Sequence, residues 1–315
     1  MKRALKWVAG LLLLGVLALL LWPAAKAGPT GAWLEAAGLE PSFETVGGLR
    51  VRYVRAGEGP AVVLLHGFGS SIFTWKDVLP ALARSRSVVA LDFPGFGGSD
   101  QPRDLSSEIY PTLVAGLMDR LGIEQATVVG NSMGGAVAVV VAARHPERVR
   151  ALVLIDAAGF NLRAADRPWL LRLLATRAGG AIFERLPVRG LPLRIALRQV
   201  FHDPALVTEE RFDEYLAPQL RPGGRASMLS VLRSHTLDPG LVAELAPKVK
   251  APTLVLWGRE DRWIPVEQAD RFVAAIPRAR KVLLDACGHL PQEERPADVL
   301  RWLQEFPEEG GAAVE

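Results

Sequence analysis

The stretch that decides the fold reads Val128-Val129-Gly130-Asn131-Ser132-Met133-Gly134-Gly135, with one serine set between glycines. It continues a short apolar run over residues 126–129 and precedes an apolar segment over 136–143 that suits a helix. Gly-x-Ser-x-Gly between a strand and a helix is typical of a nucleophile elbow, a tight turn that holds the serine backbone in a strained conformation. Only glycine beside the serine avoids a clash with the neighbouring strand and helix. The pattern predicts Ser132 as a nucleophile, with Gly130, Asn131 and Gly134 shaping the elbow.

Composition limits what the chain can be. Its 315 residues are 50% hydrophobic, which is enough for one large α/β domain or for a core with an insertion. The net charge is only +3, and no basic cluster is interleaved with aromatic residues, so we expect no nucleic-acid partner. The single cysteine, Cys287, excludes an internal disulfide and a multi-cysteine metal site. Because the five histidines lack His-x-x-x-His spacing, we expect no metal.

The N-terminal segment, residues 1–27, is a separate apolar stretch behind the basic residues Lys2 and Arg3. As a helix, residues 5–22 would span about 27 Å at about 1.5 Å per residue, close to the hydrocarbon core of a bilayer. Because the positive flank stays cytoplasmic, we expect a membrane anchor with the catalytic domain on the non-cytoplasmic side. The small residues around Lys26 leave open a cleaved signal, which would release a secreted or periplasmic protein.

After a linker over 28–42, the chain alternates strand and helix patterns. A β-hairpin is expected over 43–55, because the pair Gly47-Gly48 can supply the positive φ angles of its turn. Apolar runs of the length of buried strands follow at 61–65, 87–91, 126–129, 151–155, 253–257 and 281–284. Helical patterns separate most of them, as at 74–83, 107–121 and 266–276. This alternation predicts a mainly parallel, doubly wound sheet covered on both faces.

The alternation is interrupted once, between residues 160 and 240. That segment is helical in pattern, rich in arginine and without a strand run, so we expect an inserted helical cap. The core would then comprise residues 43–159 and 241–307, with a tail over 308–315. The leucines and arginines of the cap fit ordinary amphipathic helices, or else an apolar acyl channel with a basic face toward lipid headgroups.

Two backbone amides are candidates for an oxyanion hole. The segment His66-Gly67-Phe68-Gly69 follows the run at 61–65, and its glycines let the Phe68 amide point at a developing oxyanion. The second donor would be the amide of Met133, at the positive end of the helix after the elbow. We expect the side chain of His66 to be structural.

A carboxylate and a histidine follow two later strands. Asp261 comes after the run at 253–257, and His289 comes after the run at 281–284. Because the carboxyl ends of parallel strands share one edge of a sheet, both side chains can converge on Ser132. His289 would take the serine proton and later return it, while Asp261 would hold the imidazole tautomer. Glu260 and Asp156 remain alternatives for the acid.

With these motifs in register, residues 43–306 resemble the α/β-hydrolase superfamily. The resemblance rests on His66-Gly67-Phe68-Gly69, Asp92-Phe93-Pro94-Gly95-Phe96-Gly97, the elbow, Asp261 and His289, in the Ser, Asp, His order of that superfamily. Within it, the chain is similar to membrane-associated bacterial lipases and monoacylglycerol-lipase-like enzymes. It is also similar to the meta-cleavage-product hydrolases, which cut carbon–carbon bonds and usually carry tryptophan where this chain has Leu290. The serine nucleophile and a single cap tyrosine, Tyr215, disfavour haloalkane dehalogenases and epoxide hydrolases.

We therefore expect a serine hydrolase of carboxylic esters that acts through an acyl-enzyme, without a cofactor, on apolar acyl substrates near a membrane. One alternative is a carbon–carbon bond hydrolase of the meta-cleavage-product type. The other is a ligand-binding or partner-binding protein that keeps the triad and has negligible turnover.

Overall fold

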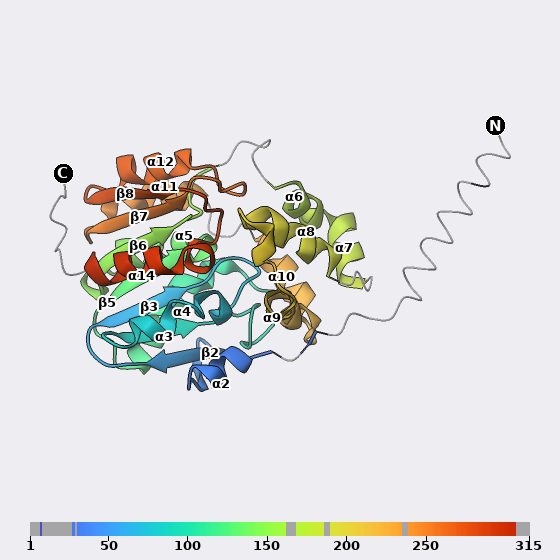
Figure 1. The fold of residues 1–315 in the computed structure, drawn as a ribbon, viewed down its shortest axis with the longest axis horizontal. Coiled ribbons are helices and arrows are strands. Elements are labelled where there is room, and N and C mark those ends of the chain that lie inside the picture. Colours follow the sequence, from blue (N-terminus) through green and yellow to red (C-terminus); the bar gives the residue numbers. More distant parts are fainter. Residues whose placement is uncertain are drawn as a thin grey trace.

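An eight-stranded sheet forms the centre of the computed structural model, which describes residues 7, 27–28, 30–161, 168–185, 190–234 and 239–306. Its strand order is β1-β2-β4-β3-β5-β6-β7-β8 (Figure 1). The strands are β1 (Pro41–Val46), β2 (Leu49–Ala56), β3 (Ala61–Leu65), β4 (Ser87–Leu91), β5 (Ala126–Asn131), β6 (Val149–Ile155), β7 (Thr253–Gly258) and β8 (Ala279–Leu284). β1 and β2 pair antiparallel, as do β2 and β4, and the other pairs are parallel. The expected α/β class is confirmed.

The antiparallel edge begins with the expected hairpin. Gly47 and Gly48 join β1 to β2 at φ 58° and φ 80°, which are positive angles that glycine adopts without steric cost. The register then places Val46 opposite Leu49. The glycine pair therefore sets the turn and, through it, the pairing of the first two strands.

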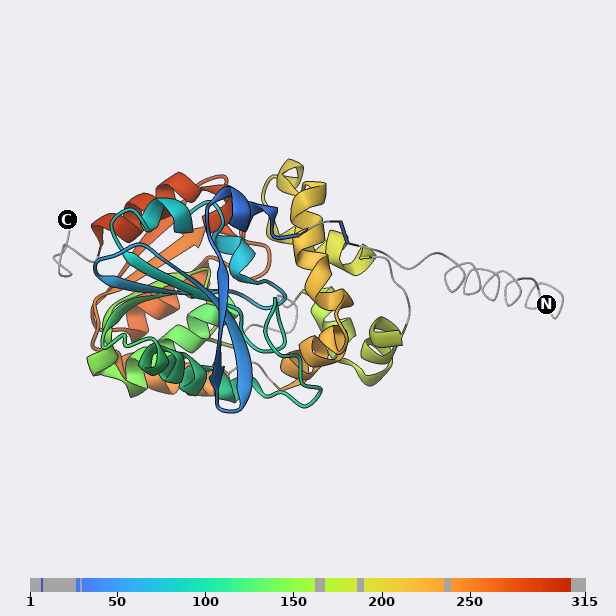
Figure 2. The same cartoon turned by 90° about the horizontal axis from the view of Figure 1, so that it is seen from below.

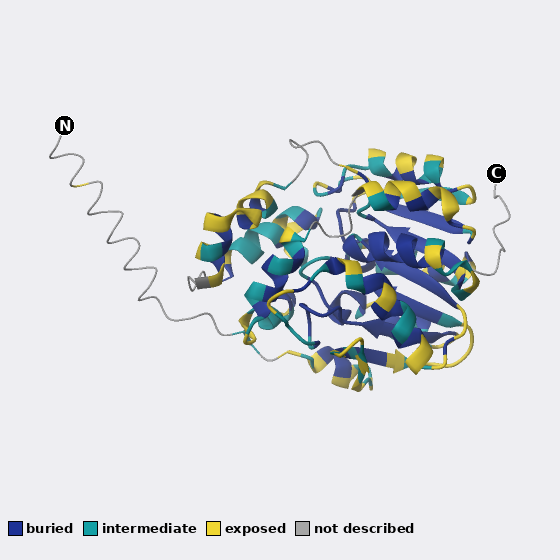
Figure 3. Cartoon of the chain, turned by 180° about the vertical axis from the view of Figure 1, so that it is seen from behind, coloured by how far each residue is buried: buried dark blue, intermediate teal, exposed yellow. Residues whose placement is uncertain are grey.

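Helices cover both faces of the sheet. One face carries α4 (Tyr110–Arg120), α5 (Met133–Arg144), α11 (Pro239–Leu245) and α12 (Glu267–Ala275). The other carries α2 (Ala32–Ala36), α3 (Leu79–Leu82) and α14 (Pro296–Glu305), next to the short α13 (Pro291–Glu294). Figure 3 shows the result, with buried strands inside and the exposed residues concentrated on the outer helices.

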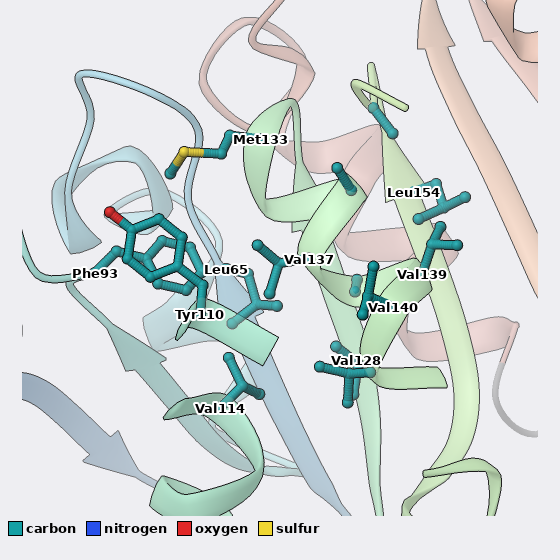
Figure 4. Close-up of a cluster of buried hydrophobic side chains, with 14 of the residues drawn as sticks. Leu65, Phe93, Tyr110, Val114, Val128, Met133, Val137, Val139, Val140 and Leu154 are labelled. Carbon is teal, nitrogen blue, oxygen red and sulfur yellow. The ribbon is translucent and has the colours of Figure 1, made fainter. Parts of the chain in front are cut away.

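Strand side chains alternate between two hydrophobic clusters, one on each face. On β3, Val63 and Leu65 point to the α5 side, while Val62 and Leu64 point to the other. Figure 4 shows the α5 side, where Val137 packs near Leu65. Burial on both faces explains why these strands read as continuous apolar runs rather than as alternating ones.

Between β6 and α11, the described residues form five helices that are not part of the sheet layers. They are α6 (Trp169–Ala175), α7 (Arg177–Arg185), α8 (Leu191–Val200), α9 (Glu209–Leu220) and α10 (Gly224–Arg233). We call α6–α10 the cap. Figures 1 and 2 agree in placing the cap beyond one end of the sheet.

The predicted helix over 74–83 is wrong as one continuous element. The structure has a 3₁₀ turn at Ile72–Trp75 and then the separate helix α3. Pro80 is the reason, because proline lacks an N–H and belongs in the first turn of a helix rather than in its interior. It therefore starts a new helix here.

The predicted location of the chain is contradicted. Across the described residues, no helix is long and apolar enough to cross a membrane. The longest of them, α5 and α9, have 12 residues each, whereas a spanning helix needs about 20. This corrects the expectation of a membrane anchor that places the catalytic domain on the non-cytoplasmic side. The expectation was based on residues 1–27, which were also the predicted signal peptide. These residues lie outside the described part of the chain except for Trp7 and Ala27.

Candidate active site

Ser132 lies in a strained turn between β5 and α5. Its backbone has φ 53° and ψ −118°, and a positive φ is uncommon for any residue except glycine. The Ser132 N–H donates to the Ile155 carbonyl at 3.0 Å, and its carbonyl accepts from the Ala158 N–H at 2.9 Å. Two hydrogen bonds, one to the last residue of β6 and one to the loop after it, therefore hold the turn in a conformation that a free chain would avoid.

The flanking glycines are required by close backbone contacts. A Cβ on Gly130 would lie 2.2 Å from the Gly134 carbonyl oxygen, and a Cβ on Gly134 would lie 2.3 Å from the Leu65 carbonyl oxygen. Neither approach is possible for a real side chain. The elbow predicted from the sequence therefore has the geometry that makes its glycines necessary.

Asp261 and His289 form a buried pair after β7 and β8. Asp261 Oδ1 accepts the backbone N–H groups of Trp263 at 2.7 Å and Ile264 at 3.0 Å. Its Oδ2 lies 2.7 Å from His289 Nδ1. Because a carboxylate can only accept, Nδ1 carries the imidazole proton and Nε2 is free to act as a base. His289 and the half-buried Ser132 line one cavity.

The two alternative acids are placed differently. The Glu260 carboxylate accepts the Cys287 N–H at 2.9 Å, so it is bonded to the backbone of the loop after β8. Asp156 is fully buried, and its carboxyl, that of Asp261 and the His289 ring have ligand atoms within 4.8 Å of one another. Such a trio could in principle hold a metal ion, but a 2.7 Å hydrogen bond already joins two of its members. That bond fits a proton between them rather than a metal.

The loop after β3 packs directly against the elbow. A Cβ on Gly67 would lie 3.0 Å from Asn131 Oδ1 and 3.1 Å from Ser132 Cβ. Phe68 lines the cavity beside it. Met133 is the first residue of α5, so its N–H is one of the amides that a helix leaves without an internal acceptor. Of the two amides proposed for an oxyanion hole, that of Phe68 belongs to the loop that packs against the elbow, and that of Met133 belongs to the first turn of α5.

His66 holds this loop in place. The Phe93 N–H donates to His66 Nε2 at 3.0 Å, so the ring proton is on Nδ1, which donates to the Gly67 carbonyl at 2.7 Å. The imidazole is fully buried, and burial lowers its pKa more than the nearby Asp92 carboxylate raises it. A neutral structural histidine fits this environment.

Asn131 braces the site from the end of β5. Its Nδ2 donates to the carbonyls of Ile155 and His289, both at 3.1 Å. One amide group therefore ties the strand that carries the serine to the loop that carries the histidine.

The cavity above Ser132 is apolar. It has an empty volume of about 700 Å³, including its mouth. Most of its wall comes from the cap, through Leu170, Leu171, Leu174, Phe183, Pro192, Leu193, Ala196, Leu197, Val200 and Met228. The polar side chains are Ser70, Asn131, Ser132, Tyr215, Gln219, Trp263 and His289, and no lysine or arginine is among the described lining residues.

A buried polar network joins the cap to the core beneath this cavity. The carboxylate of Glu293, on α13, accepts Thr74 Oγ1 at 2.7 Å, Tyr215 OH at 2.5 Å and Arg211 Nε at 2.7 Å. Burial raises the pKa of Glu293, and Arg211 acts against that rise. This network could not be predicted from the sequence, because Glu293 and Tyr215 lie 78 residues apart and no spacing marks them as partners.

The cap also bonds to the histidine loop itself. The His289 N–H donates to the carbonyl of Val200, the last residue of α8, at 2.7 Å. Glu294 accepts the N–H groups of Gly288 and His202, each at 2.8 Å. The backbone around His289 is thus held by the end of a cap helix.

Comparison with known proteins agrees with this geometry. A family model for the alpha/beta hydrolase fold matches residues 60–296. The chain is 33% identical over 276 residues to the 2-hydroxymuconate semialdehyde hydrolase of Pseudomonas sp. (strain CF600), covering 85% of this chain and 93% of that protein. It is 32% identical to the 2-hydroxy-6-oxo-6-phenylhexa-2,4-dienoate hydrolase of Comamonas testosteroni, covering 81% of this chain and 90% of that protein. A crystal structure of a bacterial membrane phospholipase A, a virulence factor, superposes with a TM-score of 0.71 at 28% identity, covering 99% of this chain and all of that one.

Replacing Glu293 tests the buried network. Glu293→Ala leaves Arg211 and Tyr215 buried without their shared acceptor, so we expect the free energy of unfolding to fall by about 3–5 kcal/mol. The matched control is Glu209→Ala, which removes the partner of Arg194 at an exposed ion pair and should change stability little. Urea denaturation of the three proteins measures both effects. Equal stability of Glu293→Ala and Glu209→Ala would contradict the role of the network.

The buried His66 predicts a pH dependence of stability. Its pKa is lowered in the folded state, so the unfolded chain binds more protons near the unfolded value of 6.5. The contribution of His66 to the free energy of unfolding is therefore present above that pH and is lost as the pH falls below it. We expect His66→Gln to flatten the slope of unfolding free energy against pH between about 5 and 7. His145→Gln, at a partly exposed histidine, is the control, and the same slope in both variants would refute the assignment.

Proposed function

Because the chain belongs to the α/β-hydrolase family, we propose that it is a serine hydrolase of carboxylic esters with an apolar acyl group. The observation that carries the proposal is that Ser132 and His289 line the same apolar cavity while His289 is hydrogen-bonded to the buried Asp261. A hydroxyl nucleophile, a base whose Nε2 is not used by the bond to Asp261 and an orienting carboxylate are the parts that acyl transfer needs.

The proposed reaction uses this chain's own groups alone. Ser132 Oγ attacks the ester carbonyl while His289 Nε2 takes its proton, and Asp261 stabilises the resulting imidazolium. The amides of Phe68 and Met133 stabilise the negative charge on the carbonyl oxygen. His289 returns the proton to the leaving alcohol, which leaves an acyl-enzyme. Water activated by the same imidazole then releases the acid and restores Ser132.

The cavity wall supports an apolar acyl group. The leucine, phenylalanine and methionine side chains of the cap can bury a hydrocarbon chain, at roughly 0.8 kcal/mol per CH₂ removed from water. A charged group in the same place would lose its hydration without a lysine or arginine to replace it. An uncharged ester is therefore a better fit than a carboxylate-bearing substrate.

The relatives support two reactions. The structural neighbour described as a phospholipase A favours ester cleavage. The two sequence relatives favour the second candidate, cleavage of a carbon–carbon bond, because they are named as hydrolases of a muconate semialdehyde and of a phenylhexadienoate, neither of which is an ester. The dienoate in one of those names carries a carboxylate, for which the described lining offers no cationic partner. Ester hydrolysis therefore comes first.

A fluorophosphonate probe tests the proposal directly. The wild-type chain should be labelled and should hydrolyse p-nitrophenyl esters, and Ser132→Ala should lose labelling and about 10⁴-fold or more in kcat. Ser85→Ala, at an exposed serine, is the matched control and should behave as wild type.

Two results would redirect the proposal. A folded wild-type protein that is not labelled would favour the ligand-binding alternative. Faster turnover of a ring-cleavage dienone, followed by its ultraviolet absorbance, than of any ester would favour carbon–carbon bond cleavage.

The cap should set the acyl-chain preference. Ala196 lies on α8 and lines the cavity, so Ala196→Trp should shorten the ester chain length at which kcat/KM is highest. Ala175→Trp places the same side chain at an exposed position of the cap and should leave the optimum where it is. The measurement is kcat/KM across a p-nitrophenyl ester series. An unchanged optimum in Ala196→Trp would show that the acyl group lies elsewhere.

A further inference from the structure

A second carboxyl group, that of Asp156, lies beside Asp261 and has no part in the reaction above. It follows β6 directly, and its backbone is held at φ 44°. The Asp156 N–H donates to the Leu256 carbonyl of β7 at 3.1 Å. A residue other than glycine at positive φ is strained, so the surrounding sheet keeps this side chain in place against a local cost.

The contacts of Asp156 leave one oxygen without a donor. Oδ1 accepts the Gly258 N–H at 3.1 Å. Oδ2 is buried and has no hydrogen-bond partner among the described residues. An ionised carboxylate in this position would be deprived of solvent at one oxygen, which is costly. A protonated oxygen would instead be a donor in need of an acceptor.

The carboxylate of Asp261 is close enough to be the acceptor for a proton on Asp156. The nearest ligand atoms of Asp156, Asp261 and His289 lie within 4.8 Å of one another. Asp261 already receives three N–H donors, one from His289 and two from the backbone, which suits its charged form. Two buried carboxylates this close cannot both be ionised at low cost, and one proton between them removes the repulsion.

We propose that Asp156 is held as a neutral carboxylic acid that donates its proton in a hydrogen bond to the Asp261 carboxylate, and so acts as a positioning residue for the acid of the triad. The bond would be the fourth on Asp261 and would fix the carboxylate plane that orients the His289 imidazole. The proposal rests on the triad chemistry of the proposed function.

The other ionisable groups around Asp156 act in the same direction. Burial raises the pKa of Asp156 well above its ordinary value, the Asp261 charge raises it further, and Glu294 on α13 adds to the rise. Burial raises the pKa of the nearby Cys287 thiol, so this neighbour stays neutral and adds no charge. His289 is the remaining neighbour, and its Nδ1–H is already given to Asp261.

Three substitutions separate the hydrogen bond from the bulk of the side chain. Asp156→Asn keeps a donor toward Asp261 and tolerates positive φ, whereas Asp156→Ala removes the donor. Asp156→Gly also removes it and adopts φ 44° without strain, so it serves if the alanine variant does not fold. We expect kcat for an ester to be about tenfold higher in Asp156→Asn than in the alanine or glycine variant, with KM similar in all. Equal kcat values in the asparagine and glycine variants would overturn the proposal.

The protonation state can be read without a substrate. Infrared difference spectra of wild type against Asp156→Asn at pH 7 should show the carbonyl stretch of a protonated carboxyl in the wild type alone. Absence of that band would overturn the proposal. A wild type that shows the band but hydrolyses no ester would instead count against the proposed function, so the two failures are distinguishable.

Discussion

The close approach of α5 to the end of β3 is the constraint on which the rest of this site depends. The helix starts so near the Leu65 carbonyl that Gly134 has no room for a Cβ. The same approach packs the loop from His66 against the elbow, where hydrogen bonds to Ile155 and Ala158 hold Ser132 at positive φ and the Met133 amide starts the helix. Backbone geometry, rather than any single side chain, therefore decides where Ser132 and the amides of Phe68 and Met133 lie.

The sequence predicts the parts of the fold that follow from local pattern and sheet topology. Buried runs such as the one at Leu65 are strands because both faces are covered, and their carboxyl ends meet at one edge. That rule is enough to bring Ser132, Asp261 and His289 together. The rule does not say which of the neighbours Glu260 and Asp261 bonds to His289. That depends on the turn in which two backbone N–H groups donate to Asp261.

Hydrogen bonds between residues far apart in the chain could not be predicted from the sequence. Glu293 meets Arg211 and Tyr215 only because the cap folds back over α13, and no period or motif encodes that contact. The predicted membrane location is the opposite case, because it was based on a local apolar pattern and no helix among the described residues can cross a membrane. Hydrophobic runs predict burial well, but they do not by themselves say what buries them.

The hydrogen bond from the His289 N–H to the Val200 carbonyl limits how the cap of this chain can be replaced. Because a cap carbonyl helps to hold the histidine loop, the cap is not a module that can be exchanged freely on a fixed core. A chimera with a foreign cap would need an acceptor at the end of α8 and a partner for Glu294, or else the loop would lose the hydrogen bonds that the cap gives it. A change of the cap would therefore alter both the wall of the cavity and the support of the histidine loop.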